Sequence, residues 1–526
     1  MEWSSLSERS LLYLRVIGLI IGCFAKFVTG SLFVFTVYED AIKDMFNYTE
    51  KEVEMQSSLL NLGLGVGFIP GMFYDRFGPT WTSVVGLVIS LTGYMLLWST
   101  TKLQAFYRPR SWLMGILFFL TGLGSIFTYM VALNTNCINF DKKHRGKIIG
   151  LLNAFFSGSP SIFAVIYYNV FSHGESTDPA NQDYGGFLLL FAVLFTISDI
   201  LCIFLIRIYP RPEDEDRQEL IIDGLDKEKE MSPRLYEDED NAIMDSRGVR
   251  LSIRSELNGS DYDTPYAEAV ISTDEKNAQA VEIVPNGINS INTSDQNQSG
   301  MDVKPKSLSI FKLLINPDFH LFTWMFSAAA SIGLVYTNNI TQVAKSVGLK
   351  QYDDMLVMII PITSAIASLF FGILSDVLKD KIPRNGFIII AGVLFAACQG
   401  LGMAFANNYA VLILSTVFCG LGIAIIWSLA PAVMSEMFDL KDFGRNWGLA
   451  ILVAALIGMG AQEVFGALYD EHITIPGSND CCGMACIRTG YAVFLGISIL
   501  SVVMGIIIVA KKQIMAFLQR RKTVTK

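Results

Sequence analysis

Charged residues are scarce in this chain of 526 residues. Asp, Glu, Lys and Arg together make up 17% of it, and hydrophobic residues make up 52%. A soluble globular protein carries about 25% charged residues. The mean hydropathy of this chain is +0.43. Its composition therefore excludes an ordinary soluble domain and predicts an integral membrane protein.

Motifs of enzymes and of nucleic-acid-binding proteins are missing from the sequence. It has no GxxxxGK[ST] phosphate-binding loop, no HExxH, and no basic patch interleaved with aromatic residues. The cysteines and histidines lack the paired spacing of a zinc site. We therefore expect no enzyme, no ATP-driven pump, no cofactor, no bound metal and no nucleic-acid partner.

The eight cysteines form two groups. Five lie inside apolar runs and are interpreted as packed thiols. The other three, Cys481, Cys482 and Cys486, share one polar loop. A local disulfide is favoured there if the loop faces an oxidising compartment.

Long apolar runs dominate the rest of the chain. A bilayer core of about 30 Å requires about 20 apolar residues per helix, and backbone groups in lipid must be paired within the helix. We therefore predict an all-α membrane protein with spans near 12–37, 54–74, 80–99, 111–137, 147–171, 186–208, 317–344, 354–377, 385–406, 409–436, 446–468 and 488–511. The first run is too long for the core of a cleaved signal peptide, so it is interpreted as a retained span.

A polar segment separates the sixth span from the seventh. Residues 211–306 are rich in charge, Ser and Asn and poor in aromatics, which predicts disorder. Two six-helix domains, 1–210 and 307–526, flank this segment. Its stretch DRQELI fits an acidic dileucine sorting pattern through Asp216, Leu220 and Ile221. That pattern predicts adaptor proteins as partners and a lysosomal or vacuolar membrane; the plasma membrane is the alternative.

The two halves resemble each other. Gly71 and Asp75 recur as Gly372 and Asp376, each 301 positions later. An internal duplication of six helices is typical of transporters built from repeats. Loops on one side carry sixteen Lys and Arg residues and those on the other carry eight, which predicts that both termini are cytosolic.

These motifs resemble those of the major facilitator superfamily. The carrying stretch is GMFYDRFG, a G-x-x-x-D-R-x-G motif after the second span, with GILSDVLKD as its degenerate copy. The stretches KFVTGSLFVFTVYEDAIKD and NLGLGVGFIPGMFYDRFGP resemble the nodulin-like branch, and monocarboxylate and oxalate carriers are similar in the same places. The resemblance implies a secondary carrier in which two pseudo-repeat bundles rock about a central site within the lipid membrane.

The resemblance also implies a cytosolic latch for one state of the transport cycle. Its expected members are Gly71, Asp75, Arg76, Gly372, Asp376, Arg145 and Arg445. Asp75 lies at a helix end, where it can accept N–H groups from a neighbouring helix N-terminus. The sequence departs from the family pattern at Pro79 and Thr80, where two further basic residues are usual. A plain structural turn is the alternative.

Lys26 is the most unusual residue of the first span. It lies eleven residues after Arg15 and thirteen before Glu39, or roughly 16–20 Å from either flank. A charge at that depth costs about 2.5–3.5 kcal/mol, and functional use is the default interpretation. Gly18, Gly22, Lys26 and Gly30 form a four-residue stripe that predicts close helix contact. We expect Lys26 to contact cargo or a coupling ion, or to pair with a carboxylate.

Two acids inside spans are candidates for that carboxylate. Glu463 in the eleventh span is the expected charge partner of Lys26 and a possible proton carrier, with helix packing as its alternative role. Asp199 lies in the sixth span, which is peripheral in the facilitator fold, so a structural role is favoured for it.

The facilitator fold lines its cavity mainly with spans 1, 4, 7 and 10, helped by 5, 8 and 11. The polar or aromatic candidates on these spans are Tyr129, Asn134, Asn153, Tyr336, Asn338, Asn339, Gln342, Trp427 and Gln462. Together with Lys26 they predict a site for a small organic anion such as a monocarboxylate, by alternating access and with possible proton coupling. The eighth span lacks the arginine usual in carboxylate carriers, which keeps an amino acid as an alternative cargo. A membrane sensor or scaffold is the competing class.

Overall fold

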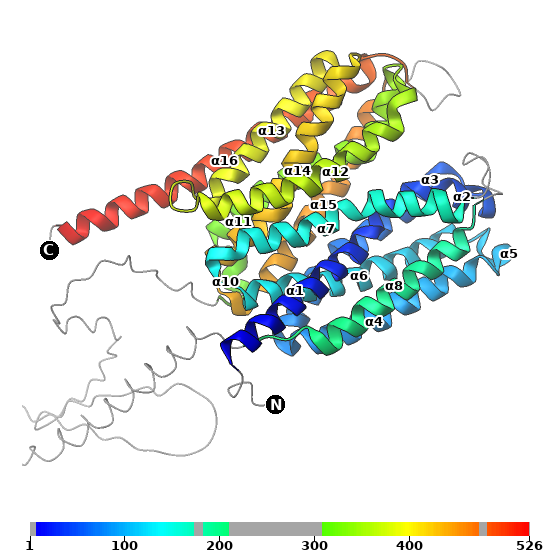
Figure 1. Cartoon of the computed structure of the whole chain (residues 1–526). Coiled ribbons are helices and arrows are strands. Elements are labelled where there is room, and N and C mark those ends of the chain that lie inside the picture. Colours follow the sequence, from blue (N-terminus) through cyan, green and yellow to red (C-terminus); the bar gives the residue numbers. More distant parts are fainter. Residues whose placement is uncertain (1–6, 173–181, 210–307, 473–480, 525–526) are drawn as a thin grey trace, which may run out of the picture. The chain divides into compact units, whose positions relative to one another are not determined.

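The computed structural model describes residues 7–172, 182–209, 308–472 and 481–524 (Figure 1). These residues form helices, short turns and one isolated bridge between Ser172 and Gln182. The all-helical class predicted from the sequence is confirmed. The segment 211–306, with Asp216, Leu220 and Ile221, lies outside the described residues.

The first half of the chain contains α1 (Glu8–Gly30), α2 (Phe35–Phe46), α3 (Glu50–Gly65), α4 (Phe68–Thr100), α5 (Gln104–Tyr107), α6 (Ser111–Asn139), α7 (Arg145–Ile166) and α8 (Tyr184–Leu205). The second half contains α10 (Ile310–Ile315), α11 (Pro317–Ser346), α12 (Asp353–Val377), α13 (Arg384–Phe405), α14 (Tyr409–Met437), α15 (Phe443–Asp470) and α16 (Ala485–Val524).

Within the described residues, eleven segments are long and apolar enough to cross a membrane. One of them, Lys51–Thr100, contains two of the predicted spans. Its chain reverses direction, because α3 runs along α6 in the same sense whereas the later part of α4 runs along α6 in the opposite sense. The break lies at Gly78, whose φ of 74° is unfavourable for residues with a Cβ atom. The total of twelve spans remains a prediction.

Local signals fix where several helices begin. Thr49 and Glu52 form a capping box at the start of α3. The Asn316 side chain accepts hydrogen bonds from the backbone N–H groups of Asp318 and Phe319, and Pro317 occupies the first position of α11. These caps satisfy N–H groups that the first turn of a helix leaves unpaired.

The two halves meet along several helix pairs, of which two are the most extensive. The helix α7 packs along α12, and α4 packs against α15. Both contacts depend on glycine: a side chain at Gly71 would overlap the carbonyl oxygen of Gly444, and one at Gly372 would lie 2.6 Å from the carbonyl oxygen of Gly146. The paired glycines therefore allow backbones of opposite halves to approach closely.

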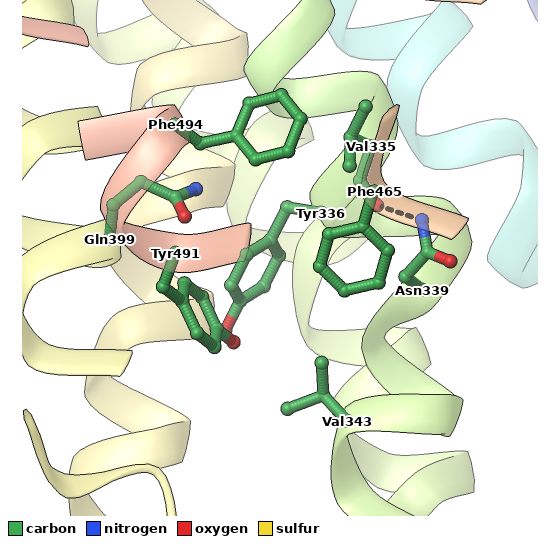
Figure 2. A pocket seen from close by; sticks show the side chains of 8 residues that line it. All are labelled: Val335, Tyr336, Asn339, Val343, Gln399, Phe465, Tyr491 and Phe494. Carbon is green, nitrogen blue, oxygen red and sulfur yellow. Dashed lines mark hydrogen bonds between the residues drawn. The ribbon is translucent and has the colours of Figure 1, made fainter. Parts of the chain in front are cut away.

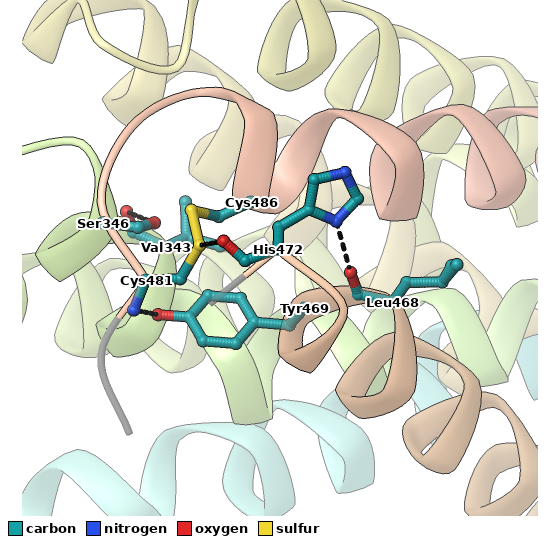
Figure 3. Close-up of a disulfide and its surroundings, with 7 residues drawn as sticks. All are labelled: Val343, Ser346, Leu468, Tyr469, His472, Cys481 and Cys486. Carbon is teal, nitrogen blue, oxygen red and sulfur yellow. Dashed lines mark hydrogen bonds between the residues drawn. A yellow bond between two sulfur atoms is a disulfide. The ribbon is translucent and has the colours of Figure 1, made fainter. Parts of the chain in front are cut away.

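A disulfide fastens the connection between α15 and α16 (Figure 3). It joins Cys481 to Cys486, whereas Cys482 is an exposed free thiol. The loop is tied to both neighbouring helices. The Cys481 N–H donates to the Tyr469 hydroxyl at 3.2 Å, and the Gly483 N–H donates to the carbonyl of Ser346 at 2.7 Å. The loop thus anchors the ends of α11 and α15 to the start of α16.

We expect the double substitution Cys481→Ser and Cys486→Ser to lower the free energy of unfolding by about 2 kcal/mol, because the bond closes a short loop in the unfolded chain. Thermal unfolding of the purified protein measures this as a lower Tm. Cys482→Ser is the matched control and leaves the Tm unchanged. An equal Tm for all three proteins would contradict a stabilising disulfide.

Candidate solute site and inter-half contacts

Lys26 lies inside the first half of the protein. Its side chain is only 2% exposed. The glycine stripe of α1 faces α6 and α7: a side chain at Gly22 would overlap Asn136, and one at Gly30 would overlap the backbone of Phe156. Lys26 therefore projects into protein between these helices.

Aromatic rings surround the ammonium group of Lys26. Its Nζ atom lies 2.9 Å from the centroid of the Tyr129 ring on α6 and 5.4 Å from that of Phe156 on α7. The negative face of an aromatic ring attracts a cation, and the attraction reaches about 2 kcal/mol when water is excluded. The rings partly compensate the burial of the charge without neutralising it.

Lys26 has no acidic partner among the described residues, whose ion pairs all involve other side chains. Glu463, the expected partner, is exposed on α15. The structure does not bring the two groups together in an ion pair, so a direct contact between them remains a prediction. The ammonium group therefore has no counter-charge within the described part of the chain.

The second half places further aromatic residues beside this region. Trp427 of α14 and Trp447 of α15 both pack on Phe326 of α11, with ring centroids 5.4 and 5.0 Å away. Trp447 and Tyr129 belong to one buried cluster that spans the two halves. The buried Nε1 atom of Trp447 makes no well-aligned hydrogen bond within the described part of the chain, although it interacts with the Tyr129 hydroxyl. It is a candidate donor to a solute.

Trp447 was not among the residues predicted from the sequence. It lies near the start of the eleventh span, which is expected to contribute less to the cavity than spans 1, 4, 7 and 10. The sequence did contain a signal for it, namely a tryptophan within a run rich in Gly and Ala.

Asn153 joins the halves directly. Its side-chain N–H group donates to the hydroxyl of Ser368 on α12 at 2.9 Å and to that of Ser428 on α14 at 3.3 Å. Asn134 lies elsewhere: a side chain at Gly444 would come within 2.7 Å of its amide nitrogen and within 2.6 Å of Asp75. The structure therefore places Asn134 at the contact between α4 and α15.

The remaining candidates lie within the second half (Figure 2). The Tyr336 hydroxyl is 3.0 Å from that of Thr416, and the amides of Asn339 and Gln462 exchange two hydrogen bonds of 3.0 and 3.2 Å. Tyr336 and Asn339 line a cavity of about 10 Å³, which has room for roughly one water molecule. Asn338 and Gln342 are exposed. The structure thus does not bring these residues together with Lys26.

Two aspartates cap helices of the opposite half. Asp75 of α4 accepts hydrogen bonds from the N–H groups of Gly444 and Arg445 at 3.0 and 2.7 Å. Asp376 of α12 accepts them from Gly146 and Lys147 at 3.0 and 2.9 Å. Each carboxylate meets the partial positive charge of a helix N-terminus. The duplicated motif therefore forms two equivalent contacts, each reaching from one half to the other.

Arginines reinforce this region, here called the basic end, which comprises loops 140–145, 378–384 and 438–443. The Arg145 guanidinium donates to the Ser435 hydroxyl at 3.1 Å. Arg445 contributes its backbone N–H to Asp75 and directs its side chain to Asp442, Asn446 and Leu308. Arg76 is exposed and stacks 5.5 Å from Phe77, without an ion pair in the described part of the chain.

Arg384 also belongs to the contacts of the basic end. From the sequence it was expected only as one of the loop cations on the cytosolic side. It is 2% exposed and pairs with Asp376 at 2.6 Å and with Glu436. It also donates to the carbonyl of Lys142 in the other half at 3.1 Å. Its position directly after Pro383, at the start of a span, was the available signal.

The loop at Pro79 and Thr80, which lacks the two usual basic residues, contacts a residue that lies just after α8. Arg207, just after α8, donates to the Thr80 hydroxyl at 2.8 Å. A basic group thus reaches this loop from elsewhere in the chain.

Comparison with known proteins agrees with this architecture. The Nodulin-like family model matches residues 15–222, and the Major Facilitator Superfamily model matches residues 319–523. "Probable transporter mch1" of Emericella nidulans is 23% identical, over 87% of this chain and 78% of its own. "Protein NUCLEAR FUSION DEFECTIVE 4" of Arabidopsis thaliana is 28% identical over 37% of this chain and 34% of its own.

Solved structures show the same fold. FucP in the outward conformation has a TM-score of 0.52 at 10% identity and covers 93% of this chain and 99% of its own. The proton:xylose symporter XylE has a TM-score of 0.57 at 12% identity, with 94% of each chain covered. The first half of the chain therefore matches the nodulin-like family and the second half matches the major facilitator superfamily, and the whole has the fold of multi-pass membrane transporters of that superfamily, which are not enzymes.

Proposed function

We propose that this protein is a secondary-active transporter of a small organic anion, with a monocarboxylate as the representative cargo. The observation that carries the proposal is Lys26, a buried cation without an acidic partner among the described residues. Leaving a charge uncompensated inside a membrane bundle is costly. A carboxylate from the solute supplies the missing negative charge.

The surroundings of Lys26 suit a small anion with an apolar body. Tyr129 and Phe156 offer ring surface beside the ammonium group, and Trp447 offers an N–H donor. The carboxylate of the solute pairs with Nζ and accepts from the indole. Its short carbon chain packs on the rings.

Alternating access follows from the two halves and their contacts. We propose that the basic end faces the cytosol, as its Lys and Arg content predicts. The Asp75 and Asp376 contacts then hold the cytosolic side closed. The state described here is then closed to the cytosol, and breaking these contacts opens the site to it.

An amino acid is the second candidate cargo. It presents the same carboxylate to Lys26, and its ammonium group requires further acceptors or aromatic faces, for which Tyr129, Phe156 and Trp427 are available. FucP and XylE are, by their titles, proton symporters of fucose and xylose. Proton coupling is proposed here on that likeness, whereas a neutral sugar would leave Lys26 uncompensated.

We propose the plasma membrane or a vacuolar or lysosomal membrane as the location. The dileucine pattern through Asp216, Leu220 and Ile221 supports sorting to a vacuolar or lysosomal membrane by adaptor proteins.

We expect Lys26→Met to reduce the kcat/KM of monocarboxylate uptake by about 30-fold or more, because removing one charge of a desolvated pair costs about 2–5 kcal/mol. Methionine keeps the length of the side chain and removes its charge. The measurement is uptake of radiolabelled pyruvate and of a panel of amino acids into proteoliposomes.

Lys312→Met, which removes an exposed lysine of α10, is the matched control and keeps wild-type uptake. Normal uptake by Lys26→Met would refute the role of Lys26. Uptake of no monocarboxylate and no amino acid by the wild type would refute the proposed cargo.

We expect Asp75→Ala to open the basic end more often. It removes two hydrogen bonds to a charged group, each contributing about 1.5–3 kcal/mol. Cys137 is a suitable reporter because it is buried on α6 and its carbonyl accepts from Arg145. In a protein whose other free cysteines are Ser, alkylation of Cys137 is expected to be about tenfold faster or more.

Asp318→Ala is the control, since its pair with Lys511 lies on the surface, where both side chains are 47% exposed. Equal alkylation rates for Asp75→Ala and wild type would show that the contact does not hold this end closed.

A further inference from the structure

Asp199 is, like Lys26, a buried charge-bearing residue of the first half without an ion pair in the described part of the chain. It lies on α8 and its side chain is fully buried. Its Oδ1 atom accepts a hydrogen bond of 2.8 Å from the hydroxyl of Thr128 on α6. Its Oδ2 atom is buried and has no partner within the described part of the chain.

The surroundings of Asp199 are small and polar. Where α4 packs against α6, Gly86 lies against Thr128 and Ser90 lies against Gly124. The hydroxyls of Ser90 and Ser125 are also buried without a partner among the described residues, whereas Ser198 interacts with Cys202. Three unpartnered oxygen atoms therefore occur on the three helices α4, α6 and α8, which pack together.

No cation of the described chain neutralises Asp199. The other titratable groups on its own helix and on the helices packed against it are Tyr184 and Cys202 of α8, Tyr74, Asp75, Arg76 and Tyr94 of α4, Tyr129 and Cys137 of α6, and Glu8, Arg9, Tyr13, Arg15, Cys23 and Lys26 of α1. Cys202 interacts with it electrostatically from one turn away. Tyr94 packs on Phe195, and Lys26 lies on the ring of Tyr129. An ionised carboxylate in this place costs several kcal/mol, which a bound proton removes.

We propose that Asp199 is a proton-binding site and that it carries the coupled proton of the transport cycle. Its carboxylate takes a proton from water on the open side to form a neutral carboxylic acid, and returns that proton to water after the halves have moved. Only the O–H bond forms and breaks.

The link to the solute site is structural, and it depends on the function proposed above. Thr128, which binds Asp199, directly precedes Tyr129, which binds Lys26. With one proton shared between them, Asp199 and Lys26 have no net charge. An arriving anion adds one negative charge, and a second proton restores neutrality. Anion and proton are therefore expected to bind together.

Infrared spectroscopy of the full chain in liposomes tests the site without knowledge of the cargo. A protonated carboxyl gives a C=O stretching band that a carboxylate does not give. We expect this band in wild type and in Glu463→Gln, falling severalfold as the pH rises, and we expect it to be absent from Asp199→Asn. Asp199→Glu keeps the carboxyl group. We therefore expect it to show a C=O band that again falls as the pH rises.

Persistence of the band in Asp199→Asn would overturn the assignment. A band that stays constant from acid to alkaline pH would show a permanently protonated structural residue and would also overturn it.

Pyruvate uptake tests the coupling. An inward gradient of one pH unit can drive about tenfold accumulation with one proton. We expect this pH-driven accumulation in wild type and not in Asp199→Asn. The variant is expected to retain exchange of pyruvate in the absence of a gradient. Accumulation by Asp199→Asn, or accumulation driven by Na⁺ in wild type, would contradict the proposal. Failure of wild type to move pyruvate would refute the cargo, while the infrared band still decides the role of Asp199.

Discussion

A charge inside a membrane-spanning bundle is stable only if something nearby compensates it. Lys26 is such a charge, and the first half of the protein is arranged around it. Glycines at 22 and 30 bring α1 against α6 and α7, and the rings of Tyr129 and Phe156 cover the ammonium group. Rings attract a cation but carry no net charge. The remaining imbalance is what makes this place suited to an anionic solute.

At the basic end, buried charges are compensated by backbone N–H groups and not by aromatic rings. Asp75 and Asp376 each accept two backbone N–H groups at the start of a helix in the opposite half. These backbone hydrogen bonds exist only while the halves touch, although Asp376 keeps its ion pair with Arg384 within its own half. We propose that these contacts hold one side of the bundle closed and break during the transport cycle, and that the charge of Lys26 binds an anionic solute.

The sequence revealed the features that depend on local pattern. The duplication predicted the equivalence of Asp75 and Asp376, and the glycine stripe predicted that Lys26 faces protein. Features that depend on how helices meet were missed. Arg384 and Trp447 gain their roles from the opposite half. Asn134 and Tyr336 lie on expected cavity helices but face other contacts. The choice of Cys481 and Cys486 among three cysteines likewise depended on the course of the loop.

The central claim is that the solute is bound through its negative charge. Competition between a monocarboxylate and its neutral amide tests this most directly, because the two differ little in shape. Binding of pyruvate and of pyruvamide to the purified protein can be compared by calorimetry. Tight binding of pyruvate with little or no binding of the amide is the predicted result. Equal binding of the two would contradict an anion site at Lys26.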